Sequence, residues 1–137
     1  MADDLSEWNR DRRKVPIILS DFDRIGASTE GLEQCQVLPE IETRPQLLGC
    51  LYVMEGSTLG GQILARHLRA TCPEYDACYP ESTPSFLIPY GLKTDEMWAR
   101  FRERLSKVTS AADLSALVGS AKKTFALMSL WLRARSS

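Results

Sequence analysis

Apolar residues recur every three or four positions in four stretches of the chain, which is the spacing of an amphipathic helix. No stretch shows the strict alternation of apolar and polar residues that predicts a half-buried strand. The pattern therefore predicts an all-α protein. The four predicted helices lie at residues 16–25, 45–70, 94–108 and 110–132.

Residues with known terminal preferences mark the helix boundaries. Pro16 suits a first helical position, because its fixed φ is helical and its missing N–H needs no partner there. Gly26 favours the left-handed conformation that ends many helices. We predict Thr94 as an N-cap, and also Ser110, which has Asp113 three residues further on as a capping-box partner.

The segments outside the helices predict one domain with two irregular connections. Residues 1–14 are strongly charged and predict a loosely ordered arm. Residues 27–43 and 71–93 are predicted as loops, the second being the longest irregular connection. Because 137 residues suffice for one domain but not comfortably for two, we predict a single domain over 1–137. Its helices form a bundle around the central helix at 45–70.

The central helix, PQLLGCLYVMEGSTLGGQILARHLRA, contains four glycines. Each glycine costs a helix interior about 1 kcal/mol relative to alanine, so something must offset roughly 3–4 kcal/mol. At 100° per residue, Gly49, Gly56, Gly60 and His67 share one face, and Gly61 lies further round. A face without side chains admits either a second helix at a tight crossing or a planar ligand.

The other sides of the central helix predict a buried position. The face opposite the glycines is mostly apolar, and a narrow polar edge separates the two faces. We therefore predict that this helix is buried on two sides. The apolar face carries Leu47, Leu51, Met54, Thr58 and Ala65, and the polar edge carries Glu55, Gln62 and Arg66.

Composition excludes several classes of partner. A formal net charge of -1 argues against a nucleic-acid surface or a polybasic membrane patch. No apolar run has transmembrane length and the charged N-terminal stretch lacks a signal-peptide core, so we expect a cytoplasmic protein. The spacing of the four cysteines matches no zinc signature, and we expect them to be reduced and mostly structural.

Other polar and aromatic residues have ordinary structural interpretations. His67 is the only histidine, and a single histidine makes neither a metal site nor a catalytic triad. Asp21, Asp23 and Arg24 predict a solvated helix face. The charged run of the third helix predicts another, although one of its arginines could reach a ligand carboxylate. The aromatic residues predicted for the core are Trp98, Phe101 and Phe125.

The run LYVMEGSTLGGQILARHL resembles the distal helix of the bacterial, biliverdin-producing heme oxygenases. Three further stretches are similar to the same family: RRKVPIILSDFDRIG, PYGLKTDEMWARF and AKKTFALMSLWL. The resemblance covers nearly the whole chain from Trp8 to Leu132 and implies an all-α, heme oxygenase-like helical bundle.

The resemblance implies roles for particular residues. In this family the distal helix bends at its glycines and passes over the heme face, where only backbone fits near the iron-bound oxygen. Ser57 stands where the animal enzymes have an aspartate that orders distal water. Phe125 matches an aromatic of the pocket wall, and Arg102 matches a basic residue that pairs with a heme propionate. The distal glycines, by match, are Gly56, Gly60 and Gly61.

The implied reaction opens heme, which is both substrate and cofactor, to biliverdin with release of iron and carbon monoxide. It uses oxygen and electrons from a ferredoxin or reductase. The family's proximal histidine lies upstream of the distal helix, whereas no histidine precedes His67 here, so the chain looks like the later part of the family domain. We expect an uncovered apolar surface and self-association. The alternative is a non-catalytic tetrapyrrole-binding or interaction module.

Overall fold

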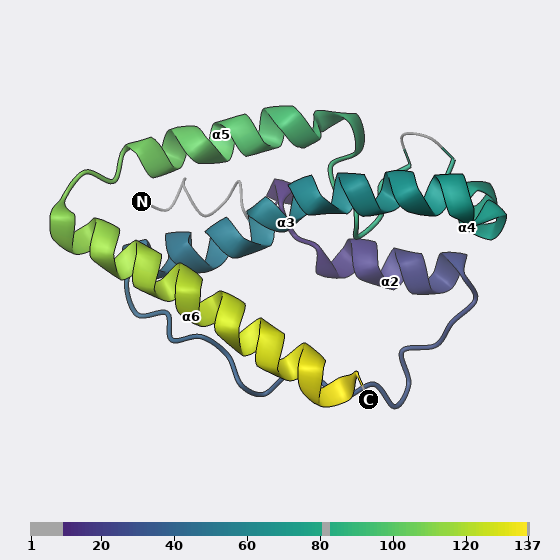
Figure 1. Ribbon diagram of the computed structural model, residues 1–137, viewed down its shortest axis with the longest axis horizontal. Coiled ribbons are helices and arrows are strands. Elements are labelled where there is room, and N and C mark those ends of the chain that lie inside the picture. The colour runs from purple at the N-terminus through teal and green to yellow at the C-terminus, as the bar shows by residue number, and fades with distance from the viewer. Residues whose placement is uncertain (1–9, 81–82, 137) are drawn as a thin grey trace. The chain divides into compact units, whose positions relative to one another are not determined.

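The computed structural model of the chain describes residues 10–80 and 83–136 (Figure 1). All regular elements in these ranges are helices, so the predicted all-α class is confirmed. The chain forms two compact units. The first unit comprises residues 1–32 and 58–94, and the second comprises residues 33–57 and 95–137.

The helices have the positions that the apolar spacing predicts. Helix α2 spans Val15–Arg24, α3 spans Arg44–Thr71, α5 spans Thr94–Ser106 and α6 spans Ala111–Arg135. Helix α3 is continuous, and its residues belong to the second unit up to Ser57 and to the first unit from Thr58 on.

The connection predicted as irregular over 71–93 contains two short helical elements. Helix α4 spans Pro73–Cys78, and a 3-10 helix, η1, spans Gly91–Lys93. Pro73 stands in the first turn of α4, where its fixed φ favours the helix, and Glu74 and Asp76 suit the positive end of its dipole. Elements this short leave too little periodicity to be predicted from apolar spacing.

Most predicted helix ends are confirmed, and one is wrong. Gly26 adopts φ +69° after α2, and its N–H donates to the Asp23 carbonyl at 3.1 Å. The Ser110 hydroxyl accepts from the Asp113 N–H at 3.1 Å. Thr94 is not an N-cap, because η1 leads directly into α5. It is already helical, with φ −55° and ψ −48°, and its hydroxyl donates back to the Gly91 carbonyl at 2.7 Å.

A capping box that we did not predict begins helix α3. The Gln46 side-chain Oε1 accepts from the backbone N–H groups of Thr43 at 3.0 Å and Glu42 at 2.7 Å. In return, the Gln46 N–H donates to Thr43 Oγ1 at 3.4 Å. The sequence Thr43-Arg44-Pro45-Gln46 has the threonine and glutamine at capping-box spacing, with Pro45 in the first turn. These hydrogen bonds fix where the glycine-rich helix begins.

Two regions that were predicted to be solvent-exposed or loosely ordered make contacts in the structure. Glu55, predicted on a polar edge of α3, is 1% exposed. The last part of the arm predicted over 1–14 has contacts within the first unit, since Lys14 Nζ donates to the Tyr90 hydroxyl at 3.1 Å. Residues 1–9 of that arm lie outside the described residues.

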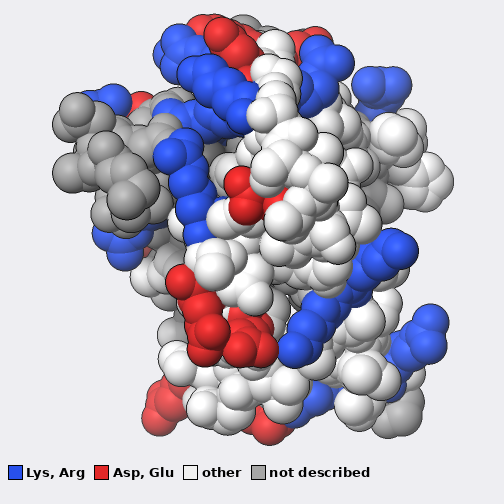
Figure 2. Space-filling model, turned by 90° about the vertical axis from the view of Figure 1, so that its left-hand side faces the viewer, with Lys and Arg blue, Asp and Glu red and all other residues white. Residues whose placement is uncertain are grey.

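The charged side chains do not separate into regions of one sign on the face shown in Figure 2. Basic and acidic side chains are interspersed there among neutral ones. Within the described ranges, none of the helices combines the length and the apolar character needed to cross a membrane.

Helix α6 leaves an apolar stripe uncovered. The buried residues of this helix are Leu117, Ser120 and Thr124. Ser120 and the backbone at Leu117 and Ala121 lie against Gly49 of α3, as described below. Four large apolar residues at near-heptad spacing are exposed instead, namely Leu114, Val118, Phe125 and Leu132.

We expect this stripe to drive self-association, since repeated apolar residues on one helix side match the seam of a paired helix. Phe125→Glu should shift the protein toward monomer in light scattering, because a buried carboxylate disfavours the seam. Ala126→Glu makes the same charge change at an exposed position outside the stripe and should leave the size unchanged. A monomeric parent at high concentration would contradict the prediction.

Candidate functional site

The glycines of α3 have different surroundings, and Gly49 serves a helix crossing. A Cβ at Gly49 would collide with the Leu117 carbonyl oxygen of α6 and lie 2.8 Å from Ser120 Cβ and 2.9 Å from the Ala121 nitrogen. The Ser120 hydroxyl also donates to the Gln46 carbonyl of α3 at 2.6 Å. Of the two predicted partners for the glycine face, a packed helix is therefore the one found at Gly49.

Gly61 serves the packing of a loop in the first unit. A Cβ here would collide with the Leu87 carbonyl oxygen and lie 2.9 Å from the Leu87 carbonyl carbon. The connection after α4 thus crosses the α3 backbone at this position. The protein itself explains why this residue is glycine.

Gly56 and Gly60 have no such neighbour. The atom nearest to a Cβ at Gly56 is Trp98 Cη2 at 3.9 Å, and a Cβ at Gly60 would meet nothing within 4 Å. Ser57, between them, is exposed, and its hydroxyl donates to the Met54 carbonyl at 2.7 Å. Among the described residues, Gly60 is therefore an open position, whereas Gly56, one helical turn earlier on α3, is in ordinary contact with the Trp98 ring; neither position requires a glycine.

The other residues implied by the resemblance lie in the second unit. Arg102 is exposed on α5, and Phe125 on α6 is 65% exposed, so the prediction of Phe125 as a core residue is wrong. Phe101 is fully buried, as predicted. Trp98 is partly buried, with its ring centroid 5.9 Å from that of Phe101 and 6.0 Å from that of Tyr52.

His67 does not fit as an axial ligand to a heme lying on Gly60. It is exposed and lies on the same helix, seven residues further on. Seven residues are about 10 Å along a helix axis, and the two positions share one face. A proximal ligand must instead approach from the opposite side of the heme plane. The positions of Gly56 and Gly60 suit a planar ligand, but the only imidazole of the chain does not complete its ligation.

A hydrogen-bonded cluster fastens α2 to the segment after α4. Asp21 accepts from the Tyr79 hydroxyl at 3.0 Å and from the Phe86 N–H at 2.8 Å. Arg24 donates to the Cys78 carbonyl at 3.1 Å, and its guanidinium lies 5.3 Å from the centre of the Tyr79 ring. Asp23 and Arg24 are exposed, as predicted for a solvated face, whereas Asp21 is partly buried by these contacts. Sequence separations of more than fifty residues hid these partners.

Burial and the hydrogen bond to Asp21 raise the pKa of Tyr79 to about 12 from its usual 10. Between these values the unfolded chain loses the phenol proton while the folded chain keeps it, so stability falls as pH rises. Tyr79→Phe should lower the unfolding free energy by about 1 kcal/mol at neutral pH. The same substitution should also remove the part of the fall in unfolding free energy at alkaline pH that comes from Tyr79. Urea unfolding across the window tests both effects, with Tyr52→Phe as the exposed control. The same alkaline slope in parent and Tyr79→Phe would contradict the assignment.

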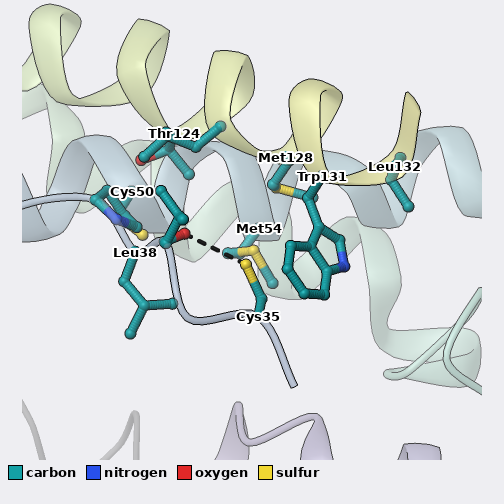
Figure 3. A pocket seen from close by; sticks show the side chains of 11 residues that line it. Cys35, Leu38, Cys50, Met54, Thr124, Met128, Trp131 and Leu132 are labelled. Atoms are coloured by element: carbon teal, nitrogen blue, oxygen red, sulfur yellow. Dashed lines mark hydrogen bonds between the residues drawn. The ribbon is translucent and has the colours of Figure 1, made fainter. Parts of the chain in front are cut away.

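An apolar pocket of about 320 Å³ lies in the second unit (Figure 3). Cys50 and Met54 reach it from α3, and Thr124 and Trp131 reach it from α6. Segment 35–39 closes a further side. Sequence analysis did not predict this pocket. Its full lining is Cys35, Val37, Leu38, Pro39, Cys50, Met54, Thr124, Leu127, Met128, Trp131 and Leu132.

A wider, more polar groove lies in the first unit beside the second half of α3. Gln62, Arg66 and Arg69 line it from α3, and Asp76 lines it from α4. Arg69 is already engaged, since it donates to the Tyr79 carbonyl at 3.3 Å and lies 3.9 Å from Asp76. Arg66 is exposed. The groove is therefore mainly a solvated boundary between helices of this unit.

All four cysteines are free.

Comparison with known proteins finds no matching family model, no matching curated protein and no matching solved structure.

Proposed function

We propose that the chain is a heme oxygenase-like protein that holds heme flat against Gly56 and Gly60 of α3. One observation carries the proposal, namely that these two helix-interior glycines have no protein neighbour that requires glycine. Together they cost α3 about 2 kcal/mol relative to alanine. At Gly49 and Gly61 close packing against backbone offsets this loss of helix propensity, whereas no such packing is found at Gly56 and Gly60. A planar ligand resting on the backbone would supply the missing reason.

Side chains of α3 and α5 have chemistry that suits a tetrapyrrole. Heme is a large apolar plane with two carboxylates at one edge. The Gly56 and Gly60 backbone offers a flat surface, and exposed Arg102 offers a guanidinium of the kind that pairs with a propionate. Ser57 is exposed between the glycines and has a hydroxyl that can hydrogen-bond water. These roles for Arg102 and Ser57 rest on the resemblance to the family.

The proposed activity is opening of heme to biliverdin with release of iron and carbon monoxide, using oxygen and electrons from a ferredoxin or reductase. When bound, heme supplies the iron and the oxygen chemistry. The residues of α3 would position the macrocycle and keep side chains away from its distal face. Because His67, the only histidine of the sequence, does not fit the opposite face, we propose that a separate small molecule supplies the axial base.

A second candidate function follows from that same mismatch. A chain that holds heme but lacks a proximal base would be a non-catalytic tetrapyrrole-binding module. The two candidates share the binding surface and differ in turnover. Biliverdin formation with an added base separates them.

Titration with hemin tests the shared claim. We expect a single saturable site with one hemin per chain and a broad Soret band, because ligation is incomplete. Addition of imidazole should sharpen the band. The absence of saturable binding, or uptake of many hemins per chain, would overturn the proposal.

A further inference from the structure

The pocket of the second unit is built by three separate segments. Gly49 brings α6 against α3, and past that crossing the facing side chains are larger. Cys50 and Met54 then face Leu127 and Trp131 across the pocket, as the close view in Figure 3 shows for three of them. The small residue Gly49 therefore permits the tight crossing, and the larger residues Cys50 and Met54 that follow it on α3 form one wall of the pocket.

A strap formed by residues 33–40 closes the outer side. Glu33 pairs with Arg135 at 2.8 Å, and Glu40 lies 3.9 Å from Lys123. These two ion pairs join the strap to α6 on either side of the pocket-lining residues 35–39. Between them, the Cys35 thiol donates to the Val37 carbonyl at 3.3 Å. Exposed ion pairs are individually weak, so the strap can open for a ligand to enter.

The lining selects a neutral ligand. None of the residues around the pocket is charged at neutral pH, and burying a charge there without a partner would be unfavourable. Met54, Met128 and Trp131 suit an aromatic ring, because thioether sulfurs and indole rings both make favourable contacts with one. The volume of about 320 Å³ is roughly twice that of a cavity of about 150 Å³ that takes benzene.

Thr124 adds a polar element to this lining. Its side chain is part of the pocket wall and the residue is 3% exposed, and its hydroxyl has no hydrogen-bond partner within the described ranges. A buried hydroxyl without a partner is unfavourable. Threonine on a helix adopts two side-chain rotamers, so a rotation can turn the hydroxyl toward a ligand.

We propose that this pocket binds a neutral aromatic molecule of about two fused rings with one hydroxyl or N–H group, which pairs with Thr124. The rings lie among the methionines and Trp131, and the polar group offsets the unpaired hydroxyl. The pocket opens on the α3 side that carries Cys50 and Met54, away from Gly56 and Gly60. This proposal is therefore independent of heme binding.

Calorimetric titration with 1-naphthol and naphthalene tests the proposal. The parent should bind 1-naphthol about threefold to tenfold more tightly, the range that one net hydrogen bond provides. Thr124→Val keeps the shape of the side chain and removes the hydroxyl, so it should abolish the preference and leave naphthalene affinity unchanged. Equal affinity of the parent for both probes, or no binding of either, would overturn the proposal.

A second pair of variants locates the bound probe. Leu127→Trp fills the pocket and should weaken both probes at least tenfold. Leu130→Trp introduces the same side chain at an exposed position of α6 outside the lining, and should leave both affinities unchanged. Circular dichroism checks that each variant is folded. Unchanged binding by a folded Leu127→Trp would place the probe elsewhere and refute the site. The Thr124→Val comparison decides the matter if Leu127→Trp does not fold.

Discussion

Gly49→Ala and Gly61→Ala should each lower the free energy of unfolding by about 2–3 kcal/mol, as expected for overpacking against backbone. At Gly49 the new methyl group would collide with the Leu117 carbonyl of α6, and at Gly61 with the Leu87 carbonyl. Backbone atoms cannot rotate out of the way as the end of a side chain can. The methyl group at Gly49 should also lengthen the hydrogen bond from Ser120 to the Gln46 carbonyl.

Two matched glycine-to-alanine variants should change the unfolding free energy in the opposite direction. Gly60→Ala on α3 and Gly119→Ala on α6 place the same methyl group where no atom of the described residues lies within 4 Å. Both should raise the unfolding free energy by up to about 1 kcal/mol, the helix-propensity gain. Urea unfolding of the four variants measures the contrast. A stabilised Gly49→Ala or Gly61→Ala would contradict the packing described for that unit.

Added imidazole should raise the rate of biliverdin formation at least about tenfold, equivalent to some 1.4 kcal/mol in the barrier. If heme lies on Gly56 and Gly60 as proposed, His67 on the same helix cannot supply a nitrogen ligand to the opposite face, and imidazole would supply it instead. His67→Ala should therefore leave the imidazole-supported rate unchanged. The measurement is biliverdin absorbance over time with ascorbate or a ferredoxin system as electron donor.

Hemin with imidazole and no protein is the control for uncatalysed oxidation. Rapid, stoichiometric conversion by the unsupplemented chain would contradict the missing-base interpretation. Hemin binding without turnover, even with imidazole, would favour the non-catalytic alternative. In either case the pocket in the second unit is unaffected, because its test uses no heme.

The helices could be predicted because local signals agree there. Apolar spacing, Pro16 and Gly26 all point to the same boundaries of α2, and the same kind of agreement holds at Ser110. Thr94 misled the prediction, because a threonine before acidic residues has the same pattern whether or not a 3-10 turn precedes it. Helix α4 was not predicted, because six residues are too few to show the apolar spacing of a helix.

The partners of each residue could not be predicted, because they come from distant parts of the chain. Four glycines on one helix look alike in sequence, yet their surroundings differ. Gly49 packs on α6, Gly61 packs on a loop, Gly56 touches only the Trp98 ring, and Gly60 is open among the described residues. The apolar repeat of α6 similarly does not say which of its sides is covered. Phe125 belongs to the repeat and is exposed, whereas Ser120 lies at the crossing.

The most direct measurement is the hemin dissociation constant of Gly60→Leu beside that of Gly119→Leu. Both replace an open helical glycine by leucine, so both variants should fold at least as well as the parent. If heme lies on the α3 backbone, Gly60→Leu should bind hemin at least about fivefold more weakly, since overpacking a contact costs about 1 kcal/mol or more. Gly119→Leu should bind like the parent. Equal hemin affinities for the two variants would contradict heme binding at the glycine face.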